Sequence, residues 1–335
     1  MQSHLLCTKL DRARRESTCA QDGRHGLAHQ FRAFDSHAAL HGSGHARAAL
    51  LRFAPPGDVR EQVAAALEED VGSGDITAAL LPSGEKLRAA VVTREATVMC
   101  GRPWVDETFL QLDPGLEVTW HAQDGDWLSP GDRLFSVAGL ARPILTGERT
   151  AINFLQTLCA TASAARRFVD AVAGTGCIIL DTRKTLPGLR NAQKYAVRCG
   201  GAQNHRIGLY DQVLIKENHI AAAGSLAAAL AAARKAAPGL KVEVEVETMS
   251  EFEIALAAGP DIVMLDDFGL AEMRSAVALN RARGGPVKLE ASGGINIENV
   301  RTIAETGVDF ISVGSITKHV DAVDLSMRAV TAELS

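Results

Sequence analysis

Long hydrophobic runs and closely spaced cysteines are both missing from this sequence of 335 residues. No stretch approaches the ~18 uninterrupted apolar residues that a membrane-spanning helix needs, so we expect no membrane partner. The six cysteines are scattered and form no C-x-x-C pair. This pattern argues against a zinc ribbon or a dithiol redox site and is typical of a protein in a reducing cytoplasm. The composition, with 47% hydrophobic and 22% charged residues, is that of a soluble globular protein.

Positive charge is also scarce in most of the chain. The formal net charge is −5, although residues 1–54 carry eight basic residues against four acidic ones. The remainder therefore has 27 basic and 36 acidic residues, a net charge of −9. A body this acidic binds nucleic acid poorly, and we expect no nucleic-acid partner.

Residues 1–54 also lack sustained hydrophobic periodicity and the apolar core of a secretory signal. We expect this segment to be a disordered extension or the result of a wrongly assigned upstream start codon. Its four acidic residues argue against an Arg-rich transit peptide, and the irregular spacing of its six histidines argues against a metal site.

A small α/β domain is predicted at residues 55–165. Asp58, followed three residues later by Glu61, predicts a capping box, and the helix that it opens is expected to end at Gly72. Two strand-like stretches follow, at 87–100 and 116–137.

A long helix comes next, and repeated β/α units follow it. Pro143 introduces the helix, whose apolar residues from Ile144 to Val169 recur at helical spacing. Beyond it, short apolar runs alternate with helical segments, which predicts parallel strands joined by right-handed crossovers. The runs are 177–181, 212–216, 241–247, 261–266, 287–292 and 309–315.

Polar residues gather at the ends of these predicted strands, where parallel α/β folds carry their chemistry. The first group, with its flanking segments, is basic: Arg149, Arg183, Lys184, Arg190, His205, Arg206 and Lys216. In an acidic body such a cluster should attract a small, strongly anionic substrate. Arginines bind carboxylates bidentately, which suits a planar polycarboxylate.

Two further groups follow along the chain. Glu245 and Asp266 end neighbouring strands, so their carboxylates can share a Mg²⁺ that also binds a diphosphate. The segments "EASGGINIENV" and "SVGSITKHV" each predict a strand, a Gly turn and a helix N-terminus, which together form a phosphate cradle. Each feature alone also fits the polar loops that begin where buried strands end, but the collection is harder to explain in that way.

The segment "LDTRKTLPGLRNAQKYAVRCGGAQNHRIGLYDQVLIKENHI" at 180–220 resembles quinolinate phosphoribosyltransferase (nicotinate-nucleotide diphosphorylase, carboxylating). "GERTAINFLQ" before it and "LEASGGI" and "DFISVGSITKHV" after it extend the resemblance to about 58–330. One departure is Ala202, which stands where a third glycine is usual.

The resemblance implies an α/β fold: an N-terminal α/β (α+β), sandwich-like domain at 55–165, then an open, roughly six-stranded parallel α/β barrel at 166–335. A C-terminal helix is expected to pack back on the first domain. A cytoplasmic homodimer with shared active sites is implied, and assembly beyond the dimer stays open. The implied reaction converts quinolinate and phosphoribosyl diphosphate to nicotinate mononucleotide, CO₂ and diphosphate, with Mg²⁺ as cofactor, in de novo NAD biosynthesis.

The resemblance also implies roles for single residues. Arg149 would reach the quinolinate of the neighbouring subunit. The quinolinate pocket would be lined by Thr182, Arg183, Lys184, His205, Arg206 and Lys216. Glu245 and Asp266 would serve the phosphoribosyl diphosphate and its Mg²⁺. Its phosphate would be held by Ser292, Gly293, Gly294, Val313, Gly314 and Ser315. Direct catalytic roles would fall to Lys184, Lys216, Glu245 and Asp266.

The alternating run "VEVEVE" places three glutamates on one face of its strand. In a barrel this face points to the interior, where a basic pocket offsets the cost of burying the acids. We expect Glu243, which lies deepest, to form a structural ion pair, Glu245 to bind ligand and Mg²⁺, and Glu247 to lie at the rim.

The expected chemistry needs no protein nucleophile, and no Ser-His or Cys-His arrangement is apparent. Departure of diphosphate leaves an oxocarbenium-like centre that carboxylates can stabilise, and the pyridine nitrogen attacks it. The positive ring nitrogen then stabilises the carbanion left by CO₂.

Three alternatives are phosphoribose transfer to nicotinate, a molybdenum-linked binding relative, and a phosphosugar lyase or isomerase. The surplus of cations argues against transfer to nicotinate, which has a single carboxylate. The intact "TRK" and "NHR" segments argue against the molybdenum-linked relative. The supply of only six strands argues against the lyase or isomerase, which needs a full eight-stranded barrel.

Overall fold

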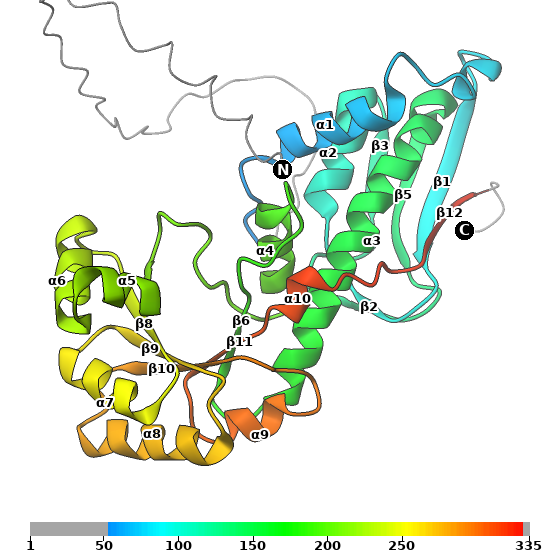
Figure 1. Ribbon diagram of the computed structural model, residues 1–335. Coiled ribbons are helices and arrows are strands. Elements are labelled where there is room, and N and C mark those ends of the chain that lie inside the picture. Colours follow the sequence, from blue (N-terminus) through cyan, green and yellow to red (C-terminus); the bar gives the residue numbers. More distant parts are fainter. Residues whose placement is uncertain (1–52, 331–335) are drawn as a thin grey trace, which may run out of the picture. The chain divides into compact units, whose positions relative to one another are not determined.

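The computed structural model describes residues 53–330, and the predictions for residues 1–52 fall outside this range. An antiparallel sheet with strand order β12-β1-β5-β3 forms the first part of the fold (Figure 1). Its strands are β1 (Lys86–Thr93), β3 (Glu117–Trp120), β5 (Arg133–Leu140) and β12 (Leu325–Ala329). A short ribbon pairs β2 (Thr97–Val98) with β4 (Trp127–Leu128). These strands confirm the two strand-like stretches predicted from the sequence.

Three helices pack with this sheet around one core, which contains Trp104, Phe109 and Phe135. They are α1 (Val59–Val71), α2 (Arg102–Leu112) and α3 (Ala141–Ala171), and a short 3₁₀ turn, η1 (Ala78–Leu80), follows α1. Helix α1 ends at Gly72, whose positive φ of 51° confirms the predicted stop.

The predicted capping box at the start of α1 is wrong. Asp58 has backbone angles of −101° and 16°, outside the extended region from which an N-cap side chain reaches the first turn. Its carboxylate instead accepts hydrogen bonds from Gln62 Nε2 and Asn191 Nδ2, both at 2.9 Å. Asp58 therefore links α1 to a segment far along the chain.

Helix α3 confirms the predicted long helix and joins two cores. Its residues from Ile144 to Ala162 lie in the first core, whereas Ala165 and Phe168 lie in a second core that surrounds the parallel sheet. The helix runs without interruption through the predicted domain boundary at residues 165 and 166, and that boundary stays a prediction.

All six predicted runs form strands of one parallel sheet. They are β6 (Ile178–Leu180), β7 (Val213–Ile215), β8 (Val242–Val246), β9 (Ile262–Asp266), β10 (Lys288–Ser292) and β11 (Phe310–Ser312). The strand order in the sheet is β6-β11-β10-β9-β8-β7. β11, the last of these strands along the chain, pairs with β6, the first, as in a barrel. Within residues 53–330, β6 and β7 are not paired with each other, so the barrel is open.

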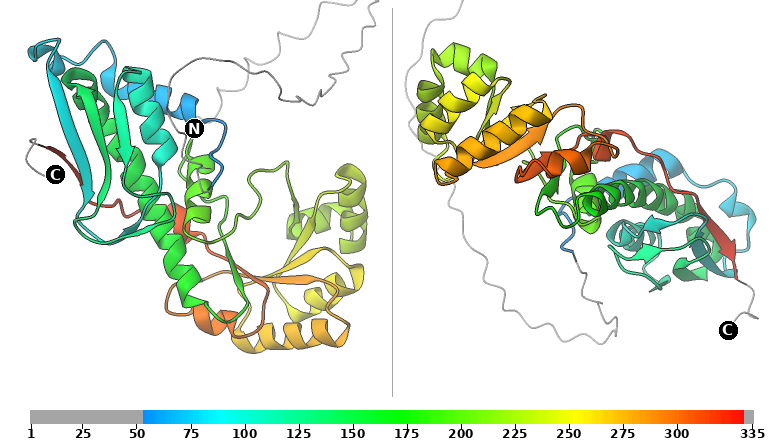
Figure 2. Two further views of the ribbon diagram at one scale, coloured as in Figure 1. Left: turned by 180° about the vertical axis from the view of Figure 1, so that it is seen from behind. Right: turned by 90° about the horizontal axis from the view of Figure 1, so that it is seen from below.

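Helices follow the strands along the chain, and α6, α7 and α8 cover the outer face of the sheet (Figures 1 and 2). The helices are α4 (Arg190–Cys199), α5 (Glu217–Ala223), α6 (Leu226–Ala236), α7 (Met249–Ala258), α8 (Leu270–Ala282), α9 (Val300–Ala304) and α10 (Ser315–Lys318). Helix α4 is different, because Ala192, Tyr195 and Ala196 pack in the first core. One of its residues, Val197, also belongs to the core around the parallel sheet.

The chain end that packs back on the first domain is a strand, not the helix that we expected. β12 pairs antiparallel with β1, with Val91 opposite Met327, at an edge that would otherwise be unpaired (Figure 2). Pairing this edge satisfies its backbone groups, which explains why an extended conformation wins there.

Candidate active site at the strand ends

The orientation of β8 places its two glutamates, Glu243 and Glu245, inside the barrel. Val242, Val244 and Val246 belong to the outer core, together with residues of α7 such as Phe252. Because side chains alternate, Glu243 and Glu245 point the other way, toward the barrel interior. Glu243 is fully buried, the Glu245 side chain is 9% exposed and Glu247 is exposed. The three glutamates thus differ in burial, which the alternation of the sequence alone could not predict.

His205 is bound at both ring nitrogens. The Arg206 N–H donates to His205 Nδ1 at 2.8 Å, so Nδ1 is an acceptor. Nε2 must then carry the proton of the neutral ring, and it lies 2.9 Å from Glu243 Oε2, to which it donates. Gln212 Nε2 donates to the same oxygen at 2.7 Å. The buried Glu243 therefore fixes the orientation of the His205 ring.

Two arginines lie close to each other beside this histidine. Burial lowers the pKa of Arg206 and the nearby positive charge of Arg183 lowers it further, whereas Glu243, Asp211 and Glu245 oppose the shift. Arg183 Nε is buried and has no hydrogen-bond partner within residues 53–330. A buried donor without a partner is costly, and an anionic ligand would satisfy it.

Lys216 and Glu245 form an ion pair at the ends of β7 and β8. Lys216 Nζ lies 2.7 Å from Oε1 and 2.5 Å from Oε2 of Glu245. On the neighbouring strand Met264 is in register with Glu245, so Asp266 lies two residues further along on the same face. Two carboxylates at neighbouring strand ends provide the oxygen ligands that Mg²⁺ prefers, and this donor set fits that ion.

The ends of β6 and β11 also meet. A Cβ atom added to Gly314 would lie 2.9 Å from Lys184 Cδ and 3.5 Å from Thr182 Oγ1. Thr317 Oγ1, in α10, donates to the Lys184 carbonyl at 2.8 Å. Residues more than 130 positions apart are thus brought together at one end of the barrel.

The predicted phosphate cradle is only partly built on a helix. Helix α10 begins directly after Gly314 but spans a single turn of four residues. After β10 no helix begins until Val300, so Gly293 and Gly294 form a turn with positive φ values of 93° and 56° instead of a helix N-terminus. The Asn-rich segment after the turn explains the delay, because Asn296 and Asn299 side chains bond backbone groups there.

The turn at Gly293 is closely packed against Asp267. A Cβ at Gly293 would lie 2.9 Å from the Asp267 backbone nitrogen and would overlap its side chain. Asp267 itself has a positive φ of 54°, and no other non-glycine residue does in the described part of the chain. Backbone strain of this kind next to Asp266 is frequent at ligand-binding sites.

Arg149 stands apart from the other predicted site residues. It is exposed on α3. Between residues 53 and 330, it forms no hydrogen bond or ion pair with another predicted site residue. This position is compatible with a role toward another subunit.

Several polar residues of the site were missed by sequence reasoning. Lys194 and Asp181 form a buried ion pair behind His205, and Glu290 is fully buried in the barrel beside Glu243. Asp181 is the last residue of the predicted run 177–181, and no role is predicted for it from the sequence. A lysine and a glutamate placed among apolar neighbours, in "AQKYAV" and "VKLEAS", are the signals that could have found the other two.

Among residues 53–330, two side-chain clusters have the composition of metal sites, but their bonds favour other roles. In the cluster of Cys100, Asp124 and Cys199, the Asp124 carboxylate accepts from two N–H groups at the start of α2 and from Tyr195 Oη. Burial raises the pKa of Asp124 to about 6. In the cluster of His205, Glu243 and Glu290, His205 Nε2 already pairs with Glu243 Oε2 at 2.9 Å.

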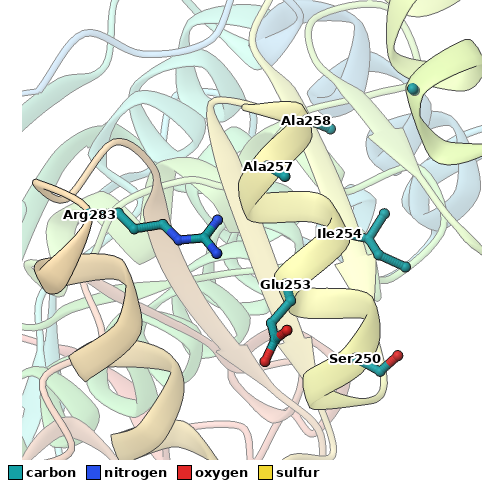
Figure 3. Close-up of a pocket in the computed structure, with 7 residues that line it drawn as sticks. Ser250, Glu253, Ile254, Ala257, Ala258 and Arg283 are labelled. Carbon is teal, nitrogen blue, oxygen red and sulfur yellow. The ribbon is translucent and has the colours of Figure 1, made fainter.

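A surface hollow of about 760 Å³ lies away from the strand ends (Figure 3). Its lining comes mainly from α7, with Glu253 facing Arg283 beyond α8. It contains none of the predicted site residues. Glu245 instead borders a separate cavity of about 450 Å³ next to α5 and α6.

The chain matches the sequence models of one protein family over most of its described length. Residues 75–159 match the sequence model of the quinolinate phosphoribosyl transferase N-terminal domain, and residues 161–328 match that of the C-terminal domain. The chain belongs to the quinolinate phosphoribosyltransferase family. The resemblance recognised from the sequence motifs is therefore confirmed.

Curated relatives and solved structures of the family cover most of the chain. The carboxylating nicotinate-nucleotide pyrophosphorylase of Mycobacterium leprae is 43% identical over 275 residues, 80% of this chain and 96% of the relative. The human protein of that name is 37% identical over 289 residues, 85% of this chain and 96% of the relative. The nicotinate-nucleotide pyrophosphorylase structure from Francisella tularensis is 46% identical and covers 82% of this chain and 97% of its own, with a TM-score of 0.79. The predicted fold class is confirmed by this structural similarity and by the antiparallel and parallel sheets of the chain.

No helix within the described residues is long and apolar enough to cross a membrane.

Proposed function

We propose that this chain is a carboxylating nicotinate-nucleotide pyrophosphorylase. It transfers phosphoribose from phosphoribosyl diphosphate to quinolinate, with release of CO₂ and diphosphate, and produces nicotinate mononucleotide for de novo NAD biosynthesis. The observation that carries this proposal is the paired guanidinium groups of Arg183 and Arg206, of which Arg183 Nε is buried without a partner in the described part of the chain. Such a pair suits a ligand with two adjacent carboxylates.

Quinolinate binds among the cations at the ends of β6 and β7. Arg183 and Arg206 hold its carboxylates, and His205 offers a ring whose orientation is already fixed by Glu243. Lys184, which packs against Gly314, lies between this cluster and the phosphate turns. The substrate is thereby oriented toward C1 of the ribose, which is the main requirement of a reaction without a protein nucleophile.

Glu245 and Asp266 hold the Mg²⁺ together with the diphosphate of the second substrate. When bound there, Mg²⁺ would supply positive charge to the leaving diphosphate. Lys216 pairs with Glu245, and a cation held by Glu245 would leave the Lys216 ammonium available to the anionic substrate. The carboxylates also stabilise positive charge on the ribose as the diphosphate departs.

A homodimer completes the site with Arg149 of the neighbouring subunit. Arg149 is exposed on α3 and has no partner among the other predicted site residues in the described range, which supports this role. Mixing inactive Arg149→Ala and inactive Lys184→Ala proteins tests it, because a mixed dimer contains one site without either change. Absence of recovered turnover, in samples where subunit exchange is demonstrated, contradicts a shared site. The free thiols of the four described cysteines support a cytoplasmic location.

The test of the reaction supplies protein, Mg²⁺ and phosphoribosyl diphosphate with either quinolinate or nicotinate. Formation of the mononucleotide and CO₂ should be equal in the quinolinate reaction. Turnover of nicotinate alone would identify transfer without decarboxylation. Turnover of neither substrate would favour a binding relative without transferase activity.

A further inference from the structure

A buried ion pair lies directly behind the cationic pocket. Lys194 Nζ, on α4, is 2.6 Å from Asp181 Oδ1, at the end of β6. Their side chains are only 3% and 0% exposed. Burial raises the pKa of Asp181 and lowers that of Lys194, while their mutual attraction opposes both shifts. A pair of this kind adds little net stability, so its value must be sought in the geometry that it imposes.

The pair holds the backbone of His205 from both sides. Asp181 Oδ1 accepts from the His205 N–H at 2.9 Å, and Lys194 Nζ donates to the His205 carbonyl at 2.9 Å. Asn204 Nδ2 strengthens the arrangement by donating to Asp181 Oδ2 at 2.7 Å and to the Lys194 carbonyl at 2.9 Å. No apolar pair could bind an N–H and a carbonyl of the same residue at once.

The segment thus held lies at the open side of the barrel, beside β6. Gln203 forms a parallel bridge with Leu180 at the free edge of β6. The next residues are His205 and Arg206, which supply two of the groups around the pocket. Because the His205 ring is in turn fixed by the Arg206 N–H and by Glu243, a shift of its backbone displaces both side chains.

We propose that Lys194 and Asp181 are a positioning pair that sets the quinolinate pocket through the backbone of His205. This inference rests on the proposed function. The phosphate turns are built on β10 and β11, which are other strands of the barrel, and they make no hydrogen bond to the pair within residues 53–330. Loss of the pair therefore weakens quinolinate binding and leaves the binding of phosphoribosyl diphosphate nearly unchanged.

The test uses the full-length protein with Lys194→Met combined with Asp181→Asn, so that no unpaired charge is left buried. Quinolinate and phosphoribosyl diphosphate affinities are measured by titration calorimetry, and kcat and KM by steady-state kinetics. We expect the quinolinate Kd to rise at least about 10-fold and kcat to fall by up to about 10²-fold, as a displaced binding group would cause. The KM for phosphoribosyl diphosphate should change less than about twofold, well below the effect of a misplaced contact.

Two controls separate positioning from general damage. Val197→Ala, in the barrel core on the same helix, lowers stability without touching His205. Lys288→Met with Asp309→Asn removes an exposed ion pair at the starts of β10 and β11. Both should retain the wild-type quinolinate Kd. If the double variant of the buried pair loses thermal stability but keeps its quinolinate affinity, or loses both substrates equally, the positioning role is wrong. If the wild-type protein does not bind quinolinate, the proposed function itself fails, and the inference fails with it.

Discussion

Replacing Glu290 by glutamine should make the protein more stable at neutral pH, and the gain should grow as the pH rises. Glu290 is fully buried in the barrel, where its carboxylate adjoins Glu243 and Ser312 and its Oε2 lies 3.7 Å from His205 Nε2. Burial, together with the negative charge of Glu243, raises the pKa of Glu290 well above its usual value. The folded protein therefore keeps a proton that the unfolded chain releases above about pH 4.3. Between these two pKa values the unfolded state binds fewer protons, so stability falls with rising pH by up to about 1.4 kcal/mol per unit.

Glutamine has nearly the same shape and no titratable proton, so this contribution to the slope disappears. Urea unfolding of both proteins at pH 5, 6, 7 and 8 measures the difference in the free energy of unfolding. The advantage of Glu290→Gln should be smallest at pH 5 and increase at each step until the folded-state pKa is passed. An advantage that is constant across this range, or one that shrinks with rising pH, would refute the protonated state of Glu290.

Three further predictions concern the reaction. Lys184→Ala should fold normally, as judged by circular dichroism, but lose turnover on the order of 10²-fold because the lysine orients the reacting group; near-normal kinetics would remove it from the site. Gly314→Ala places a methyl group 2.9 Å from Lys184 Cδ, so Lys184 must move. We therefore expect lower quinolinate turnover at an unchanged melting temperature. A fall in both turnover and melting temperature would point to a folding defect instead. Chelation of Mg²⁺ should abolish turnover reversibly, and Glu245→Gln should raise the Mg²⁺ concentration needed for half-maximal rate, whereas an unchanged Mg²⁺ dependence would argue against Glu245 as a ligand.

The strands of the barrel could be predicted from the sequence because the sheet is covered on its outer face by helices. Runs such as "CIIL" and "IVML" have no polar interruption, and each ends at the residue where its loop begins. The order of charges at these ends then indicated an anion pocket, carboxylates and phosphate turns. The glutamates of β8 needed the neighbouring strands as well, because alternation fixes a face but not what lies opposite it.

Other features depend on contacts between distant segments, which a local pattern does not contain. Asp58 has the sequence of a helix cap, but Gln62 and Asn191 take its carboxylate. Lys194 looks like a surface residue of an ordinary helix until α4 is packed in the first core, which turns it toward Asp181. The turn after β10 looks like a helix start, yet the asparagines after it delay the helix to Val300.

The position of β12 has a consequence for how the protein is made. The sheet that opens the fold lacks its edge strand until residues 325–329 have been made, long after β1, β3 and β5. N-terminal domains usually fold first while the chain is still growing, but here the early sheet must wait with the outer edge of β1 unpaired. An open edge of this kind invites pairing with other chains, so newly made protein is exposed to aggregation until β12 is in place.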